Sequence, residues 1–337
     1  MSPTLRRTLS LVAAASLLAV SPAGAPTASG RGRFVDLRKF PKPKITGKQI
    51  VAGLENFVER FPMRQNGLPN NDAAAHFLAR ETKKLGYKTR IVKFKAGLPE
   101  EKVDVVEAIK RGTQKPNEWI AFVAHYDIVE QSYQGAYDDG SGTNMLRYFA
   151  KAFAKVKTKR SIVMLWFDGE EDGLLASEAY TKMLKKKGQK VHAALGFDMV
   201  GIGYPAPYCI CIWHGPNPAD LKGRTITDYV NFDFLKFPKG NGGDRWPLGG
   251  TAAGSRGHVC NCGVNTRNSD EQNFAKRGYF TMRWAGMKTA AYYPGYHQPW
   301  DTVPFIELVA GSRKKFEKGS ENTFRSAYYT ALVLDNL

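Results

Sequence analysis

The sequence predicts an α/β fold in which helices cover both faces of a mixed, mostly parallel twisted sheet. Two observations support this prediction. Apolar, strand-like runs alternate with helical patterns through much of the 337-residue chain, which is the order typical of α/β proteins. Acidic or imidazole side chains directly follow several of these runs, as they do where the strands of an open sheet end at a ligand crevice.

Two helices are expected before the first strand. Helical periodicity covers Gly47 to Phe61 and Asp72 to Leu85, and Gly86 supplies a stop signal after the second helix. The strand-like runs that follow are Lys88 to Phe94, Val103 to Ile109, Ile120 to His125, Ser161 to Phe167, Ala193 to Asp198 and Tyr208 to Trp213. Helical patterns at about Gly142 to Val156 and Leu174 to Lys187 alternate with the later strands.

The first 25 residues have the pattern of an export signal. Arg6 and Arg7 precede an apolar run from Leu9 to Val20, and small residues follow at Ala23 to Ala25. That run is too short to span a bilayer. We therefore expect a signal peptide over residues 1–25, a basic N-terminal arm over 26–45 and one domain over 46–337. The protein would be secreted or periplasmic, without a stable membrane anchor.

The chain is strongly basic, with a formal net charge of +18. Nucleic-acid binding is one interpretation, but there is no recognition motif and no aromatic interleaving of the basic clusters. A solvated lysine-rich surface, as at Lys185-Lys186-Lys187, explains the charge more simply. We expect no nucleic-acid partner, although a cationic exterior could favour acidic cell-surface polymers.

The four cysteines form two C-x-C pairs, Cys209/Cys211 and Cys260/Cys262. Two cysteines separated by one residue on a strand face the same side, so each pair would bridge more easily to the other pair than within itself. Export favours one or two disulfides. Free buried thiols and a four-thiolate zinc site are the alternatives, and structural zinc usually has wider ligand spacing.

The candidate catalytic chemistry begins at two strand ends and the turns after them. In Ala124-His125-Tyr126-Asp127, Asp127 can accept the second N–H of His125 and fix its tautomer. In Tyr137-Asp138-Asp139-Gly140, paired carboxylates lie directly before a helix. One Asp could cap that helix, and the other could bridge two metal ions.

Acidic residues also follow the next two strand-like runs. Four acids lie within five positions in Asp168-Gly169-Glu170-Glu171-Asp172, and they would repel one another unless a cation neutralised them or the loop were fully solvated. One Glu could bind a metal while its neighbour takes a proton from a metal-activated water. Asp198 ends an apolar strand, where burying an unpaired charge is costly.

A second imidazole lies near the C-terminus, in Tyr296-His297-Gln298-Pro299-Trp300-Asp301. Asp301 could orient His297, although a lone histidine of this kind is more often structural. Because the carboxyl ends of neighbouring strands face one crevice, we expect the separate phrases to converge.

Taken in order, the five phrases A-H-Y-D, Y-D-D-G-S-G, F-D-G-E-E-D-G-L, F-D-M-V-G and Y-H-x-x-x-D-T resemble those of the co-catalytic dizinc aminopeptidases. The resemblance is to the aminopeptidase Y and secreted bacterial leucine aminopeptidase type of zinc peptidase clan MH, and it extends from about Gly47 to the C-terminal helix. It implies the zinc exopeptidase, phosphorylase/hydrolase-like fold over residues 46–337. It also implies an exported aminopeptidase that holds two Zn²⁺ ions and acts on a peptide or aminoacyl substrate.

The resemblance also implies a role for each site residue. Asp138 would bridge the two zinc ions, with His125 and Asp198 completing one site and Glu171 and His297 the other.

Three further residues would support the reaction. Glu170 would be the general base and would later give its proton to the leaving amine. Asp127 would orient His125, and Tyr296 would donate to the tetrahedral oxyanion.

Two departures from the family pattern leave the substrate preference open. Ser269-Asp270-Glu271 stands where many relatives have Ser-Asp-His, and the stretch from Gly240 to Gly263 has no counterpart. A glutaminyl cyclase, which normally works with one zinc, and a carboxypeptidase are alternatives on the same fold. A non-catalytic binding ectodomain is disfavoured because every expected ligand and the base are present. The sequence predicts neither the native metal nor the oligomeric state.

Overall fold

The computed structural model of the protein describes residues 39–202, 210–214, 259–264, 269–285 and 293–337, with the main chain alone described in 210–214 and 259–264. The signal and most of the basic arm predicted at the N-terminus lie outside these residues. No helix in the described ranges combines the length and apolarity needed to cross a membrane.

Within the described residues, eight strands form one sheet in the order β1-β2-β4-β3-β5-β8-β6-β7. The strands are β1 (Lys88–Ala96), β2 (Glu101–Lys110), β3 (Lys115–His125), β4 (Arg160–Phe167), β5 (Lys190–Asp198), β6 (Ile210–His214), β7 (Val259–Val264) and β8 (Thr281–Ala285). The helices are α1 (Gly47–Arg60), α2 (Pro69–Lys84), α3 (Ser141–Phe153), α4 (Leu175–Lys186), α5 (Glu271–Lys276), α6 (Val303–Ala310) and α7 (Arg313–Asn336), with a short π-helical turn, η2 (Ala136–Gly140), before α3.

The sheet is mixed and mostly parallel, which confirms the predicted fold class. Strands β4, β3, β5 and β8 run parallel to one another in its centre. The hairpin β1–β2 adds an antiparallel edge through β2 and β4. At the other edge β6 is antiparallel to β8 and parallel to β7. The central parallel strands therefore all end at the same edge of the sheet.

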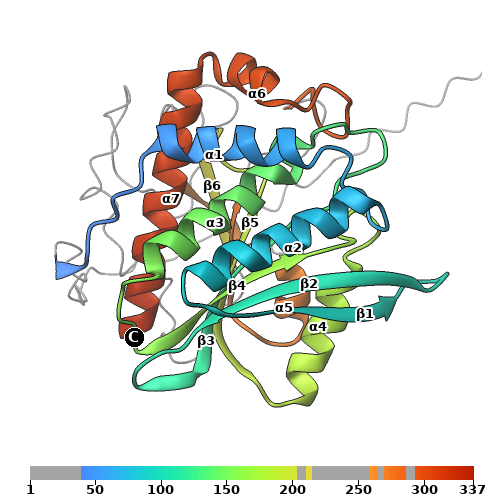
Figure 1. Cartoon of the computed structure of the whole chain (residues 1–337). Helices are drawn as coiled ribbons and strands as arrows, with labels where there is room; N and C mark the ends of the chain where they lie inside the picture. The colour runs from blue at the N-terminus through green and yellow to red at the C-terminus, as the bar shows by residue number, and fades with distance from the viewer. Residues whose placement is uncertain (1–38, 203–209, 215–258, 265–268, 286–292) are drawn as a thin grey trace, which may run out of the picture. The chain divides into compact units, whose positions relative to one another are not determined.

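Both faces of the sheet are covered by helices, as alternate strand residues require. On β3, Phe122 packs into the apolar cluster that contains α1, α2, α3 and α7, whereas its neighbours Ala121 and Val123 pack into the cluster that contains α4 and α5. Figure 1 shows α1, α2, α3 and α7 gathered on one face, with α4 and α5 on the other.

Helix α1 shows why the predicted elements form where they do. Thr46 accepts the backbone N–H of Gln49, and the Gln49 side chain accepts the backbone N–H of Thr46. This reciprocal capping box satisfies two donors that a helix start otherwise leaves without partners. Ile50, Leu54 and Phe57 then repeat at helical spacing and are buried. Helix α2 begins earlier than predicted because Pro69 occupies its first turn, where a missing N–H costs nothing.

The aromatic centre of the larger cluster allows a stability prediction. The ring of Phe149 in α3 lies 4.6 Å from Phe122, 5.0 Å from Phe197 and 4.9 Å from Phe324, measured between centroids. Phe149→Ala is expected to lower the free energy of unfolding by about 3–5 kcal/mol, because it removes buried area and leaves a cavity. Denaturant titration measures this change.

Leu308 in α6 supplies the control, since it is 72% exposed. Leu308→Ala should change the free energy of unfolding by less than about 0.5 kcal/mol. Equal effects of the two substitutions would contradict the assignment of Phe149 to the core.

Candidate metal centre

The six candidate side chains meet at the carboxyl edge of the parallel strands. His125 is the last residue of β3, Asp198 is the last residue of β5, and Glu170 and Glu171 follow the end of β4. Because β4, β3 and β5 are adjacent and parallel, these residues leave the sheet side by side. Asp138 joins them from η2.

The carboxylate of Asp138 lies between the two histidines. Its Oδ1 is 3.3 Å from Nε2 of His125, and its Oδ2 is 3.4 Å from Nε2 of His297. Nε2 of His297 is also 3.2 Å from Oε2 of Glu171. Each oxygen of one carboxylate thus faces a different imidazole, which is the arrangement of a bridging ligand.

Two groups of three residues therefore share Asp138. One group is His125, Asp138 and Asp198, the other is Asp138, Glu171 and His297, and within each group the ligand atoms lie within 4.8 Å of one another. A third combination of the same residues, His125 with Glu170 and Glu171, also satisfies that distance.

The polar atoms at this centre suit a metal ion. In the part of the chain that the structure describes, Nε2 of His125, Nε2 of His297 and Oε1 of Glu171 are buried and form no hydrogen bond. Leaving such atoms unsatisfied costs about 1–3 kcal/mol each. Imidazole nitrogens and carboxylate oxygens are the donors that zinc prefers in catalytic sites.

The electrostatics of the centre also favour a cation. Burial opposes the charge on His297, but the carboxylates of Asp138 and Glu171 outweigh it and raise the pKa of His297 to about 10. Burial likewise opposes the charge on His125, yet Glu170, Asp127 and Asp138 raise its pKa well above the usual value. Burial and repulsion from Asp138 raise the pKa of Glu171. A divalent ion would replace these protons when it binds.

Asp127 contacts His125 on the side away from Asp138. Its Oδ1 lies 3.4 Å from Nδ1 of His125, and its Oδ2 accepts the backbone N–H of Glu171 at 3.1 Å. One buried carboxylate thus touches both the His125 ring and the chain of Glu171.

The paired aspartates of η2 divide two tasks, as the sequence allowed. Asp138 faces the histidines, whereas Oδ1 of Asp139 accepts the backbone N–H groups of Gly142 at 2.8 Å and Met199 at 3.2 Å. Asp139 therefore binds the first turn of α3 and joins it to the end of β5.

Asp301 has a different position from the one expected. The sequence suggested that it orients His297, but its carboxylate accepts the backbone N–H groups of Tyr137 at 2.9 Å and Asp138 at 3.0 Å, and the hydroxyl of Tyr293 at 2.6 Å. Burial raises the pKa of Asp301 to about 7, although these hydrogen bonds oppose the rise. Asp301 thus fixes the main chain at Asp138, the residue that the two groups share.

The remaining two candidates, Glu170 and Tyr296, lie beside the histidines proposed as metal ligands. Oε2 of Glu170 is 4.0 Å from Nε2 of His125. The ring of Tyr296 stacks on the ring of His297, with centroids 3.7 Å apart and planes inclined by 27°. The catalytic roles of Glu170 and Tyr296 stay predictions.

The Ser269-Asp270-Glu271 phrase has a structural explanation. Glu271 is buried and lies 3.6 Å from the guanidinium of Arg283 on β8, which is also buried. Glu271 therefore belongs to a buried ion pair.

The cysteine predictions lie outside what the structure describes. Cys209 is not among the described residues, and only the main chain is described at Cys211, Cys260 and Cys262. Most of the unmatched Gly240 to Gly263 stretch is also outside them.

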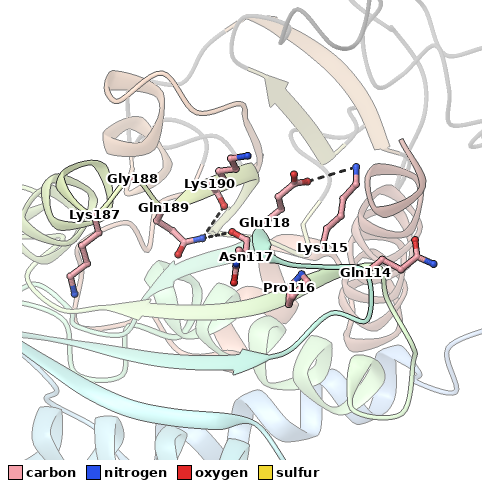
Figure 2. A pocket seen from close by; sticks show the side chains of 9 residues that line it. All are labelled: Gln114, Lys115, Pro116, Asn117, Glu118, Lys187, Gly188, Gln189 and Lys190. Carbon is pink, nitrogen blue, oxygen red and sulfur yellow. Dashed lines mark hydrogen bonds and ion pairs between the residues drawn. The ribbon is translucent and has the colours of Figure 1, made fainter.

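A surface depression of about 580 Å³ is separate from this centre. Figure 2 shows its lining, which comes from Gln114–Glu118 at the start of β3 and from Lys187–Lys190 between α4 and β5. His125 and Asp198 end those same strands. Since a strand rises about 3.3 Å per residue, β3 alone places this lysine-rich depression roughly 30 Å from the acidic cluster.

The sequence is similar to those of several named proteins. Aminopeptidase YwaD of Bacillus subtilis is 26% identical over 291 residues, which are 82% of this chain and 57% of that protein. The chain thus spans little more than half the length of this relative, and 32% and 23% of two fungal proteins named probable zinc metalloprotease.

Solved structures share the fold. The zinc aminopeptidase BSAP from Bacillus subtilis has a TM-score of 0.62 at 14% identity, with 86% of this chain and 96% of that chain covered. A glutaminyl cyclase from an Acidobacteriales bacterium has a TM-score of 0.64 at 17% identity, with 91% and 100% covered. At such low identities the likeness concerns the fold.

A sequence profile of peptidase family M28 matches residues 104–313. This segment is more than half of the chain, and it contains all six side chains that meet at the sheet edge. The predicted resemblance to these peptidases is therefore confirmed, and the chain belongs to peptidase family M28.

Proposed function

We propose that the protein is a zinc-dependent aminopeptidase whose two metal sites share Asp138. One observation carries the proposal: the two oxygens of Asp138 face His125 at 3.3 Å and His297 at 3.4 Å. Asp198 accompanies the first histidine and Glu171 the second. Relatives named aminopeptidase YwaD and aminopeptidase Y support the reaction class.

The chain offers complete donor sets for two zinc ions. His125, Asp138 and Asp198 would hold one ion, and Asp138, Glu171 and His297 the other. Bound zinc lowers the pKa of a coordinated water and polarises a carbonyl group. Asp127 would fix the ring of His125, because it lies 3.4 Å from the nitrogen that faces away from Asp138.

Glu170 is the proposed general base. It neighbours Glu171 in the chain and lies close to His125, so its carboxylate can take a proton from water without leaving the site. The same carboxyl would then donate that proton to the departing amine. The hydroxyl of Tyr296 would donate to the oxyanion that forms on the carbonyl carbon.

Chelation tests the metal requirement. Dialysis against a strong chelator should reduce hydrolysis of aminoacyl chromogenic substrates to background, and added Zn²⁺ should restore it. The reason is that the proposed reaction needs bound zinc to activate water and to polarise the carbonyl group. Zinc per chain is measured alongside activity. Full activity in a chain with no metal would refute the proposal.

Blocked peptides decide which chain end is used. An aminopeptidase should cleave a C-terminally amidated peptide and fail on its N-acetylated counterpart, and a carboxypeptidase should do the reverse. Pyroglutamate formation from N-terminal Gln without hydrolysis, with one tightly bound zinc, would instead favour a glutaminyl cyclase, the name that some structural neighbours carry.

The location of the protein in the cell is a separate proposal. Secretion or export to the periplasm rests on the signal pattern of residues 1–25. Sequencing the N-terminus of the protein recovered from the medium or periplasm checks it.

A further inference from the structure

Arg64 is a buried cation that the proposed reaction does not use. It is fully buried in the connection between α1 and α2, before the segment that the family profile matches. Its guanidinium donates to the carbonyl oxygens of Gln134 and Gly135, the latter at 2.8 Å. The same Gly135 carbonyl accepts the N–H of Gly140 at 2.9 Å. Arg64 therefore donates a hydrogen bond to the same carbonyl that closes the turn containing Asp138.

Neighbours of Arg64 extend this contact along the chain. The backbone N–H of Met63 donates to the carbonyl of Tyr133 at 2.8 Å. The Gln65 side chain donates to the carbonyls of Val129 at 3.4 Å and Glu130 at 3.3 Å. The α1–α2 connection thus contacts several backbone carbonyls between Val129 and Gly135, in the segment that leads into η2.

Asn71 links the α1–α2 connection to the acidic segment that contains Glu170 and Glu171. Its side-chain amide donates to Oδ1 of Asp168 at 2.7 Å and to the carbonyl of Arg64 at 3.0 Å. Asp168 lies two residues before Glu170. One short stretch of chain therefore contacts both the segment of Asp138 and the segment of Glu170 and Glu171.

The charge of Arg64 would act against metal binding. Burial lowers the pKa of Arg64 to about 10, while Asp301, Asp139, Asp127 and Asp138 oppose that change. The guanidinium is still charged at neutral pH. A cation near a site repels a second cation, so charge alone predicts that removing Arg64 tightens zinc binding. A geometric role predicts the opposite.

We propose that Arg64 and Asn71 form a brace that fixes the distance between the two acidic segments, so that Asp138 can serve both metal sites. Arg64 is a positioning residue, since it acts through the main chain of Gln134 and Gly135. The proposal rests on the proposed two-metal function and assigns it two residues outside the family match.

The decisive measurement is zinc affinity by chelator competition. Arg64→Met should weaken the binding of at least one zinc ion by about 10–100-fold, the usual effect of losing a group that orients a ligand. It should lower kcat more than it raises KM. Arg64→Lys keeps the charge but offers a single donor nitrogen in place of the guanidinium fork, so it should recover part of the affinity.

Arg147→Met is the matched control. Arg147 is also buried, it pairs with Glu81 at 2.6 Å, and its guanidinium lies 5.6 Å from the ring of Phe57, against 5.4 Å for Arg64. It contacts neither acidic segment through a hydrogen bond within the described residues. Arg147→Met should therefore lower thermal stability without changing zinc affinity. Unchanged or tighter zinc binding in folded Arg64→Met would overturn the brace.

A second pair of variants covers the case in which Arg64→Met does not fold. Asn71→Ala removes the contacts with Asp168 and with the carbonyl of Arg64 and should also weaken zinc binding. Asn70→Ala removes a contact with the carbonyl of Pro62 and, among the described residues, none with either acidic segment. Equal affinities in these two variants would then refute the proposal. Wild-type protein that binds two zinc ions but cleaves no peptide contradicts only the aminopeptidase activity. Wild-type protein that binds fewer than two contradicts both.

Discussion

Glu170→Gln is expected to lower kcat by about 10²–10⁴-fold while the zinc content stays unchanged. The amide has nearly the shape of the carboxylate, but it cannot accept a proton from water. Glu170 belongs to neither of the two groups that share Asp138, so its replacement should leave both metal sites complete. Steady-state kinetics and zinc analysis of the same preparation measure the two effects.

The control for this variant comes from the same loop. Asp172 is exposed, and it follows the pair Glu170 and Glu171 directly. Asp172→Asn should therefore retain close to full activity. A Glu170→Gln enzyme with normal turnover would remove Glu170 as the base, and one that loses zinc would make Glu170 a ligand instead. The third group of three, which joins Glu170 to His125 and Glu171, makes the second outcome a real test.

Asp138→Ala is expected to weaken the binding of both zinc ions and to reduce hydrolysis to background. Both groups of metal-type donors contain this carboxylate, so one substitution removes a ligand from each. Asp198→Ala and His297→Ala each remove a ligand from one group only. After dialysis against a weak chelator, metal analysis should give less zinc per chain for Asp138→Ala than for either single-site variant.

The pattern of losses among the three variants is the informative result. If Asp138→Ala retains as much zinc as Asp198→Ala, the shared-ligand arrangement is wrong, and the two sites do not depend on one carboxylate. Circular dichroism of each metal-free variant ensures that the comparison is made between folded chains.

The elements with strong periodicity could be predicted from the sequence. Strands β3, β4 and β5 are long apolar runs, and the predicted runs lie within them. Strand β8 was not predicted, because it is short and contains the buried Arg283, whose charge is balanced by Glu271 from α5. Only the folded chain brings that partner within reach.

The candidate site divides in the same way. His125, Asp138, Glu171, Asp198 and His297 each lie in a local phrase that indicates a chemistry. For His125, Glu171 and Asp198, the end of a parallel strand or the turn after it also predicts where the side chains meet. Asp301 and Arg64 could not be assigned, because their partners are backbone groups far away in the sequence. Because nearly every residue has a backbone N–H and a carbonyl, the sequence does not show which of them a distant side chain will contact.

The positions of Asp301 and His297 in the sequence bear on the order in which the parts of the centre emerge during biosynthesis. The carboxylate that holds the turn of Asp138, and the imidazole of His297, both come from the last part of the chain. A nascent chain that has emerged only as far as β8 possesses the strands but neither of these side chains. The group of Asp138, Glu171 and His297 therefore becomes complete only after the chain has emerged beyond β8, whereas His125, Asp138 and Asp198 are all present before that point.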